Sequence, residues 1–163
     1  MGRRAAWLAG LVALGAAVTS ALAAPSAYDE ALVRQFEGVC LKDRTSFDGA
    51  KAAAEADGWA VAEADANPEL AALIGFSNAA ANDIKLNNGE FDFAIYGKAT
   101  EGGQRYVVLS SALTMPGNAR QNIVGCYLYD FDATTAPDPA AVDALLGVTP
   151  TAQQVDEDIA SYQ

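Results

Sequence analysis

The sequence contains no histidine. This absence excludes Ser-His-Asp and Cys-His catalytic groups, imidazole zinc sites and the general base that enzymes use most often. Only two cysteines are present, too few for a thiolate zinc site. No glycine-rich phosphate loop occurs, because the segment "EGGQ" at residues 101–104 lacks the Lys and Ser/Thr that a P-loop requires. Among the side chains that enzymes commonly use for catalysis, only the carboxylates of Asp and Glu are abundant in this sequence.

Basic residues are also scarce. The 163 residues include 10 Lys and Arg against 21 Asp and Glu, which gives a net charge of −11. An acidic surface of this kind repels nucleic acid and anionic lipid, so neither is an expected partner. Such a charge more often serves solubility than recognition.

The first residues have the pattern of a secretory signal peptide. Arg3 and Arg4 precede an apolar run over residues 5–18, and small residues follow at the positions that signal peptidase reads. We therefore interpret residues 1–23 as a signal peptide that is cleaved after Ala23.

A membrane anchor is the rival interpretation of this run, but an anchor needs about 20 apolar residues to span the hydrocarbon layer. The run is shorter, and Pro25 follows it closely. The expected mature chain, residues 24–163, has no contact with the membrane and is long enough for a single domain. These features predict a soluble periplasmic or secreted bacterial protein.

Both cysteines, Cys40 and Cys126, lie in the expected mature chain, 86 residues apart. In an oxidising compartment such a pair predicts one structural disulfide. In the chain-entropy model, closing a loop of this length stabilises the fold by about 4–5 kcal/mol. A redox pair is disfavoured because no C-x-x-C spacing is present to lower a thiol pKa.

Two helices are predicted near the start of the mature chain. Ser26 with Asp29 three residues later has the pattern of a capping box. Ser46 is the expected N-cap of a second, alanine-rich helix, which Gly58 ends. Trp59 then turns back into the core.

Further helices are predicted on both sides of the strands. Asn67 followed by proline begins a short third helix, for which Gly75 is the expected end. A fourth helix covers Pro139–Leu146. The tail from about residue 150 is interpreted as a short fifth helix or a frayed end.

The middle of the chain changes to strand spacing. Several short runs either alternate apolar with polar residues or are rich in β-branched and aromatic residues. Turn residues such as "NNG" and "EGGQ" separate these runs, and the pattern predicts an antiparallel meander. The fold class is therefore α+β: a three- or four-stranded antiparallel meander packed with N- and C-terminal helices. The expected strands are residues 84–86, 90–97, 105–115 and 123–131.

The last strand presents two different faces, because side chains alternate along a strand. Cys126 lies on one face, which packs under the N-terminal helix if the disulfide forms. Tyr127 and Tyr129 lie on the other, with Tyr106 from the neighbouring strand beside them. Either a helix covers this second face, which is favoured, or Tyr106, Tyr127 and Tyr129 form an exposed binding face.

The same strand runs into Asp130, Asp132 and Thr134, spaced D-x-D-x-T. Dehalogenase-like phosphotransferases use this motif at the first strand of a parallel sheet, with a later Lys or Arg. Here no basic residue follows Arg120, and the sheet is expected to be antiparallel, so we reject the similarity. The segment also fails the EF-hand pattern, which leaves Asp130 and Asp132 as weak metal candidates only.

Two arginines, Arg105 and Arg120, flank the predicted sheet. Arginines at such positions are able to clamp an anion, but at turn ends they are usually solvated, and we interpret both in that way.

The segments "QFEGVC", "DGW" and "GCYLY" together resemble a group of small exported bacterial proteins. These proteins share a leader, an F-x-x-x-C segment, a G-W pair after an alanine-rich helix, and a second cysteine in a late strand. The resemblance covers most of the mature chain, although each motif is short. It implies a periplasmic α+β domain and no activity or catalytic residues.

Two functional hypotheses follow. The first is a non-enzymatic binding protein without a cofactor, whose partner is another periplasmic or extracellular protein or a small ligand. The alternative is a small carboxylate- or metal-dependent hydrolase that uses Asp130 and Asp132.

Overall fold

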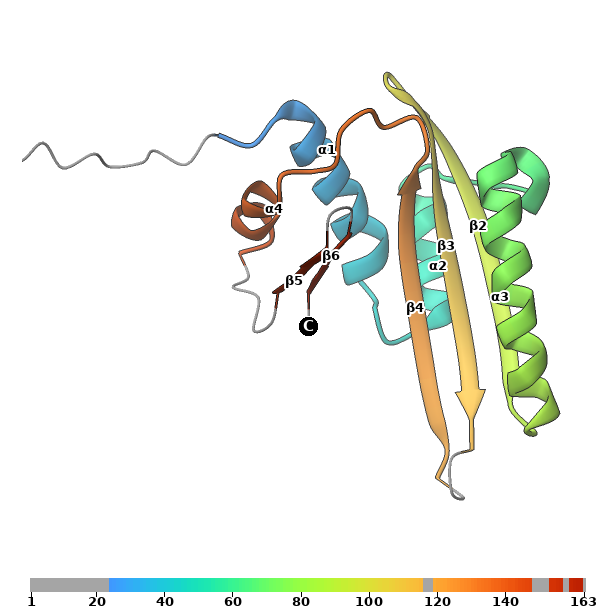
Figure 1. The fold of residues 1–163 in the computed structure, drawn as a ribbon. Helices are drawn as coiled ribbons and strands as arrows, with labels where there is room; N and C mark the ends of the chain where they lie inside the picture. Colours follow the sequence, from blue (N-terminus) through green and yellow to red (C-terminus); the bar gives the residue numbers. More distant parts are fainter. Residues whose placement is uncertain (1–23, 116–118, 148–152, 157–158, 163) are drawn as a thin grey trace, which may run out of the picture.

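The protein has an α+β fold, as the sequence predicts (Figure 1). The structure is a computed structural model, and it describes residues 24–115, 119–147, 153–156 and 159–162. The predicted signal peptide, residues 1–23, lies outside the described residues.

A four-stranded antiparallel sheet forms the centre of the molecule. The strands follow the chain in the order β1-β2-β3-β4, so the sheet is the predicted meander. The prediction placed an additional strand at residues 84–86 before β2, but that strand does not form. The strand that precedes β2 in the sheet is β1, which pairs with the edge of β2 opposite to β3. The bounds are Ala60–Val61 for β1, Glu90–Thr100 for β2, Gly103–Thr114 for β3 and Gln121–Asp130 for β4.

The first two helices begin where the capping residues predict. In α1, Ala27–Phe36, the Ser26 hydroxyl accepts from the Asp29 N–H and the Asp29 carboxylate accepts from the Ser26 N–H. The chain continues as a π-helical turn, η1, Glu37–Leu41. Helix α2, Phe47–Ala56, is capped by Ser46, and Gly58 follows it with a φ of +81°.

Helix α3 is much longer than its predicted form. It covers Pro68–Leu86, directly after a short 3-10 turn, η2, Ala64–Ala66. Gly75 was expected to end it, but a glycine in a helix interior costs only about 1 kcal/mol and α3 continues through it. The apolar residues 84–86 are therefore its last turn and form no strand.

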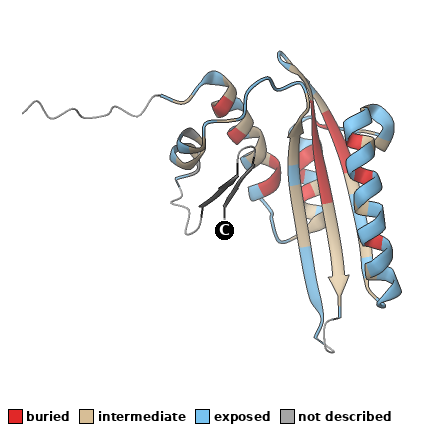
Figure 2. Cartoon of the chain, viewed as in Figure 1, coloured by how far each residue is buried: buried red, intermediate tan, exposed pale blue. Residues whose placement is uncertain are grey.

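One face of the sheet packs against α2 and η1. Its buried side chains include Tyr96, Val107 and Leu109 from the strands, and Val39 and Trp59 from the covering segments. We call this the covered face. Burial on this face is greatest in the half of the sheet that contains the end of β4, near Asp130. It decreases towards the opposite end, where the strands project beyond α2 (Figure 2).

Helix α3 packs on the opposite face of the sheet (Figure 1). Leu70 and Ile74 contact Ile95 of β2 and Tyr106 and Val108 of β3. At the end of β4, Tyr129 packs partly against this cluster, whereas Ile123 and Tyr127, which lie earlier on the same face of β4, are exposed.

The chain after β4 returns to α1. Helix α4, Pro139–Leu146, is capped by Asp138, and Gly147 follows it with a φ of +63°. The Asp138 N–H donates to the Asp29 carboxylate (3.3 Å), which joins the starts of α4 and α1. The predicted fifth helix is wrong where the tail is described, because Gln153–Asp156 and Ile159–Tyr162 form an antiparallel pair, β5 and β6.

No helix within the described ranges has both the length and the apolar character needed to cross a membrane.

Candidate functional site

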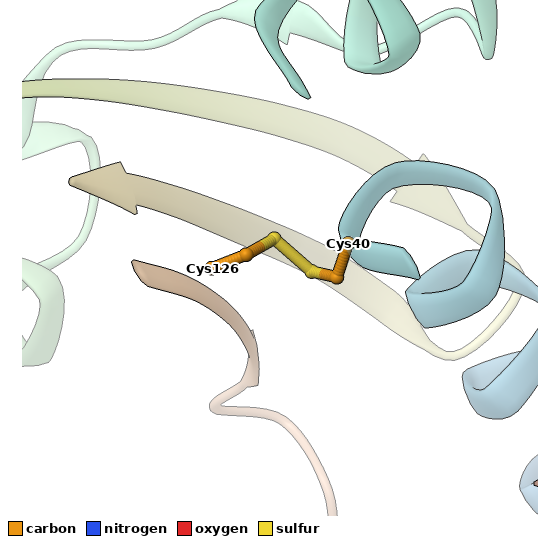
Figure 3. Close-up of a disulfide and its surroundings, with 2 residues drawn as sticks. All are labelled: Cys40 and Cys126. Carbon is orange, nitrogen blue, oxygen red and sulfur yellow. A yellow bond between two sulfur atoms is a disulfide. The ribbon is translucent and has the colours of Figure 1, made fainter. Parts of the chain in front are cut away.

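The disulfide joins β4 to the helical layer on the covered face (Figure 3). Cys126 of β4 and Cys40 of η1 are bonded, with their Cα atoms 5.5 Å apart. The prediction of one structural disulfide is confirmed. The bond links η1 to β4, which pairs with β3 alone within the described residues, and it lies beside the core packing of Val39.

A buried ion pair occupies the end of the same face. Arg105 of β3 donates from Nε to Asp130 Oδ2 (2.7 Å), and the two residues are direct cross-strand partners. Their side chains are only 5% and 8% exposed, so the interpretation of Arg105 as a solvated turn residue is wrong. The error has a physical cause: helix α1 lies over this end of β3, and its position cannot be inferred from the residues near Arg105.

Helix α1 completes the surroundings of this pair. Arg105 Nη1 donates to Gln35 Oε1 (2.7 Å), and the guanidinium lies over the ring of Tyr28 at 5.1 Å. Burial raises the pKa of the Tyr28 hydroxyl, and the negative charge of Asp130 raises it further. The Asp130 carboxylate and the Arg105 guanidinium neutralise each other. Buried charges in folded proteins are normally paired in this way.

Asp132, the second aspartate of the D-x-D-x-T motif, has a different role. Its Oδ2 accepts the Gln104 N–H (3.1 Å) and lies against Gly103, whose φ of +132° shapes the β2–β3 turn. Asp130 and Asp132 therefore serve separate partners and do not face one another across a shared site. Within the described part of the chain, no three Asp, Glu, Cys or His side chains are grouped to hold a metal ion.

A pocket of about 410 Å³ opens between α1, the end of β4 and the loop after it. Its walls include Leu32, Leu128 and the loop residues 133–137, and its polar side chains are those of Tyr28, Asp130, Thr134 and Thr135. The only formal charge among these lining residues is that of Asp130, which is already paired with Arg105. The pocket therefore has no unpaired charged group with which to activate a water or a substrate.

On the opposite face of β4 the aromatic rings are stacked in a row. The rings of Tyr127 and Tyr129 are 6.4 Å apart and inclined by 22°, and those of Tyr129 and Phe131 are 5.6 Å apart and inclined by 6°. We call these three residues the aromatic ladder. Tyr106 of β3 is the direct partner of Tyr129 and also contacts Phe131, with ring centres 5.9 Å apart.

The three predicted tyrosines lie close together but differ in accessibility. Tyr106 is only 5% exposed, because α3 covers it and its hydroxyl reaches the Ala66 carbonyl (3.4 Å). Tyr127 is 51% exposed, and Tyr129 is half-buried between its neighbours. Burial raises the pKa of Tyr129, and the adjacent Tyr127 adds to this effect. The accessible part of the predicted face is therefore confined to β4.

The sequence left two alternatives for this face: a covering helix or an exposed aromatic surface. The structure has both, on different strands. Helix α3 covers β2 and β3, and the cluster that it forms reaches Tyr129; the earlier part of β4 remains open, with Ile123 exposed two positions before Gly125 and Tyr127 exposed two positions after it. We call Ile123, Gly125, Tyr127 and Tyr129 the open face of β4.

Gly125 is a part of this surface that sequence reasoning missed. A Cβ at this position would lie 2.6 Å from Ser110 Oγ and 2.9 Å from Tyr127 Cε2. The absence of a side chain therefore lets the Tyr127 ring lie back over the strand. A glycine inside a strand pattern signals close approach of another group, so the sequence did carry the information.

Comparison of the chain with protein-family models, with curated protein sequences and with solved structures gave no match. The assignment of a site therefore depends on the geometry above.

Proposed function

We propose that this is a non-enzymatic binding protein that recognises another protein through the open face of β4. The observation that carries this proposal is the exposure of Tyr127, which is 51% accessible although its ring is stacked on Tyr129. Tyrosine is enriched in protein interfaces because it combines a large apolar surface with a polar end and loses little conformational entropy on binding.

The open face has the form expected of a binding surface. Stacking on Tyr129 and the gap at Gly125 hold the Tyr127 ring in place before any partner arrives. Preorganisation of this kind lowers the entropic cost of association. The exposed Ile123 extends the apolar surface along the same strand. An aromatic residue at the centre of such a patch typically contributes about 2 kcal/mol or more to binding.

The disulfide supports action in an oxidising compartment, which for this chain is the periplasm or the exterior of a bacterial cell. The signal peptide predicted at residues 1–23 leads to the same proposal. We propose that the chain is exported, folds around the Cys40–Cys126 bond and acts outside the cytoplasm.

The hydrolase alternative receives less support from the geometry. Asp130 is held in a buried ion pair and Asp132 accepts a backbone N–H in a turn, so neither is poised as a nucleophile or a general base. Both arrangements are those of carboxylates that stabilise a fold.

Affinity capture with three tagged forms of the mature protein tests the proposed function. The forms are the unchanged protein, Tyr127→Ser, and Phe76→Ser as a matched control. Phe76 is 85% exposed, but it lies on α3 and outside the open face. Each form is incubated with an extract of the compartment to which its host exports it, and the bound proteins are quantified by mass spectrometry.

We expect at least one protein to be retained in stoichiometric amount by the unchanged and Phe76→Ser forms and to fall about tenfold or more with Tyr127→Ser. Equal retention by all three forms, or retention of no protein by the unchanged form, would contradict the proposed function. Thermal unfolding of all three forms controls for loss of structure.

A further inference from the structure

The sheet has two edges, and they differ in how well they are protected. On one side β2 pairs with the short β1 and carries Glu90, Asp92 and Lys98. On the other side β4 pairs with β3 alone within the described residues. Its first half projects beyond α1, α4 and the β5–β6 pair (Figure 1), and its residues 121–123 are exposed (Figure 2).

The usual devices that prevent an edge from pairing with another strand are missing along β4. Residues 121–129 read "QNIVGCYLY" and contain no charged residue and no proline. Proteins normally place lysine, proline or a bulge on an exposed edge to prevent pairing with another chain. An uncharged edge of this length in an exported protein is therefore a feature that favours pairing.

The register of the sheet identifies which backbone groups face outward. The Ala62 N–H donates to the Ile95 carbonyl (3.0 Å), so the backbone groups of Ile95 are directed towards β1. Ile95 is opposite Val108, and Val108 is opposite Tyr127. Because successive residues of a strand direct their N–H and C=O groups to alternate sides, Val108 and Tyr127 bond to each other. The outward groups of β4 are then those of the alternate residues Asn122, Val124, Cys126 and Leu128.

Charge indicates what kind of segment these groups would accept. From Arg120, which directly precedes β4, to the end of the chain there are seven carboxylate side chains and one basic residue, Arg120 itself, within a protein of net charge −11. Helix α4 and the β5–β6 pair, which belong to this stretch, lie on the β4 side of the sheet in Figure 1. A second copy of the same acidic chain would be repelled, whereas a basic segment would be attracted.

We propose that the outer edge of β4 accepts an extended segment of a partner protein that carries Lys or Arg, as a fifth strand of the sheet. This proposal rests on the proposed function and specifies the mode of binding and the chemistry of the partner. Main-chain hydrogen bonds to the outward groups supply affinity in strand addition, and alternate side chains supply specificity.

The two faces of β4 give the added strand two different neighbours. Side chains of the added strand on the open face would lie beside Ile123, Gly125 and Tyr127, where apolar residues fit next to the exposed ring. Side chains on the covered face would lie beside Asn122 and Val124, at the end of the sheet that projects beyond α2 (Figure 2). There long basic side chains reach solvent.

A proline at position 124 separates strand addition from other modes of binding. The Val124 N–H is directed outward, so Val124→Pro removes a donor from the free edge and leaves the β3–β4 ladder intact. Proline is tolerated at such edge positions. The control is Val124→Thr, which keeps both the N–H and a β-branched side chain. Unfolding by urea and the intact mass of the oxidised chain verify that each variant is folded and disulfide-bonded.

The probe is a short synthetic peptide of alternating Lys and Val, with blocked ends. Two matched peptides serve as controls: one has Glu in place of Lys, and one carries N-methyl groups on both edges so that it cannot pair. We expect the Lys/Val peptide to bind the unchanged protein and Val124→Thr. Its affinity should fall up to about tenfold with Val124→Pro, which removes one hydrogen-bond donor from the edge, and by more than that with N-methylation, which removes several. The Glu/Val peptide should bind more weakly by a similar factor.

Several results would overturn the proposal. These are absence of binding by the Lys/Val peptide at millimolar concentration, equal binding by the N-methylated peptide, and unchanged binding to Val124→Pro. A concentration-dependent dimer of the unchanged protein that Val124→Pro abolishes would identify a second copy as the occupant instead.

The outcomes also separate this proposal from the proposed function. Loss of protein capture with Tyr127→Ser but not with Val124→Pro would retain the open face as a binding surface and reject strand addition. Capture that neither change affects would reject both.

Discussion

The two faces of β4 show how differently alternate residues of one strand can be used. Cys126, Leu128 and Asp130 are held by a disulfide, a hydrophobic core and a buried ion pair. Tyr127 and Tyr129, which alternate with them in the sequence, stack on each other on the opposite face, where Tyr127 is exposed and Tyr129 packs partly against the cluster that includes α3. The strand is thus held in place through one face, and part of the other face is accessible to solvent.

The cause of this difference is the placement of the covering segments. Cys40 and the helices α1 and α2 bring the N-terminal part of the chain onto the covered face as far as the edge strand. Helix α3 contacts β2 and β3 on the opposite face, and the cluster that it forms with them reaches Tyr129 near the end of β4 but leaves Ile123 and Tyr127 exposed. An edge strand that is anchored from one side can present aromatic side chains on the other without becoming disordered.

Removal of the disulfide should give the largest loss of stability. We expect the double change Cys40→Ala and Cys126→Ala to lower the free energy of unfolding by about 4–5 kcal/mol, because the 86-residue loop is no longer closed in the unfolded chain. Urea unfolding followed by the fluorescence of the buried Trp59 measures the change. The reduced parent protein should behave in the same way. Equal stability of the variant and the parent would show that the covered face does not depend on the disulfide.

Disruption of the buried ion pair should have the next largest effect. Asp130→Asn leaves the Arg105 guanidinium buried without its counter-charge, and we expect a loss of about 3 kcal/mol. Replacement of both partners, Arg105→Met with Asp130→Leu, should recover most of this loss, since neither leaves a buried charge. The same urea titration compares the variants. A double change as damaging as the single one would mean that Gln35 and Tyr28 depend on the pair for their positions.

The smallest effect, and the most direct comparison, comes from two neighbouring residues. Leu128→Ala removes packing from the covered core and should cost about 2 kcal/mol. Tyr127→Ser removes a half-exposed ring on the open face and should cost less than about 1 kcal/mol. Both values come from chemical denaturation under identical conditions. A Tyr127→Ser loss as large as that of Leu128→Ala would show that the Tyr127 ring belongs to the core and would weaken the proposal that the open face binds a partner.

Local chemistry accounts for the elements that the sequence predicts correctly. The hydroxyls of Ser26 and Ser46 and the carboxylate of Asp138 accept from backbone N–H groups within a few residues, so each helix start can be read without knowledge of the rest of the fold. The meander is equally local, because each strand pairs with the next one along the chain.

The errors arise where a distant segment decides. Residues 84–86 have a composition suited to a strand, but they are the last turn of α3, whose apolar side packs on β2 and β3. Arg105 follows a turn, and yet it is buried because α1 brings Gln35 and Tyr28 over it. The rejection of the D-x-D-x-T motif as an active site was not among these errors: Asp130 bonds to Arg105 and Asp132 accepts the N–H of Gln104.

The sequence by itself determined the α+β class, the helix starts, the meander and the pairing of Cys40 with Cys126, because capping, alternation and the presence of only two cysteines are local or combinatorial properties. Only the tertiary structure decided which side of the sheet is closed. Alternation shows that Tyr106, Tyr127 and Tyr129 share a face, but accessibility depends on how far α3 extends across the sheet. That extent is set by packing between segments far apart in the chain, and no local pattern encodes it.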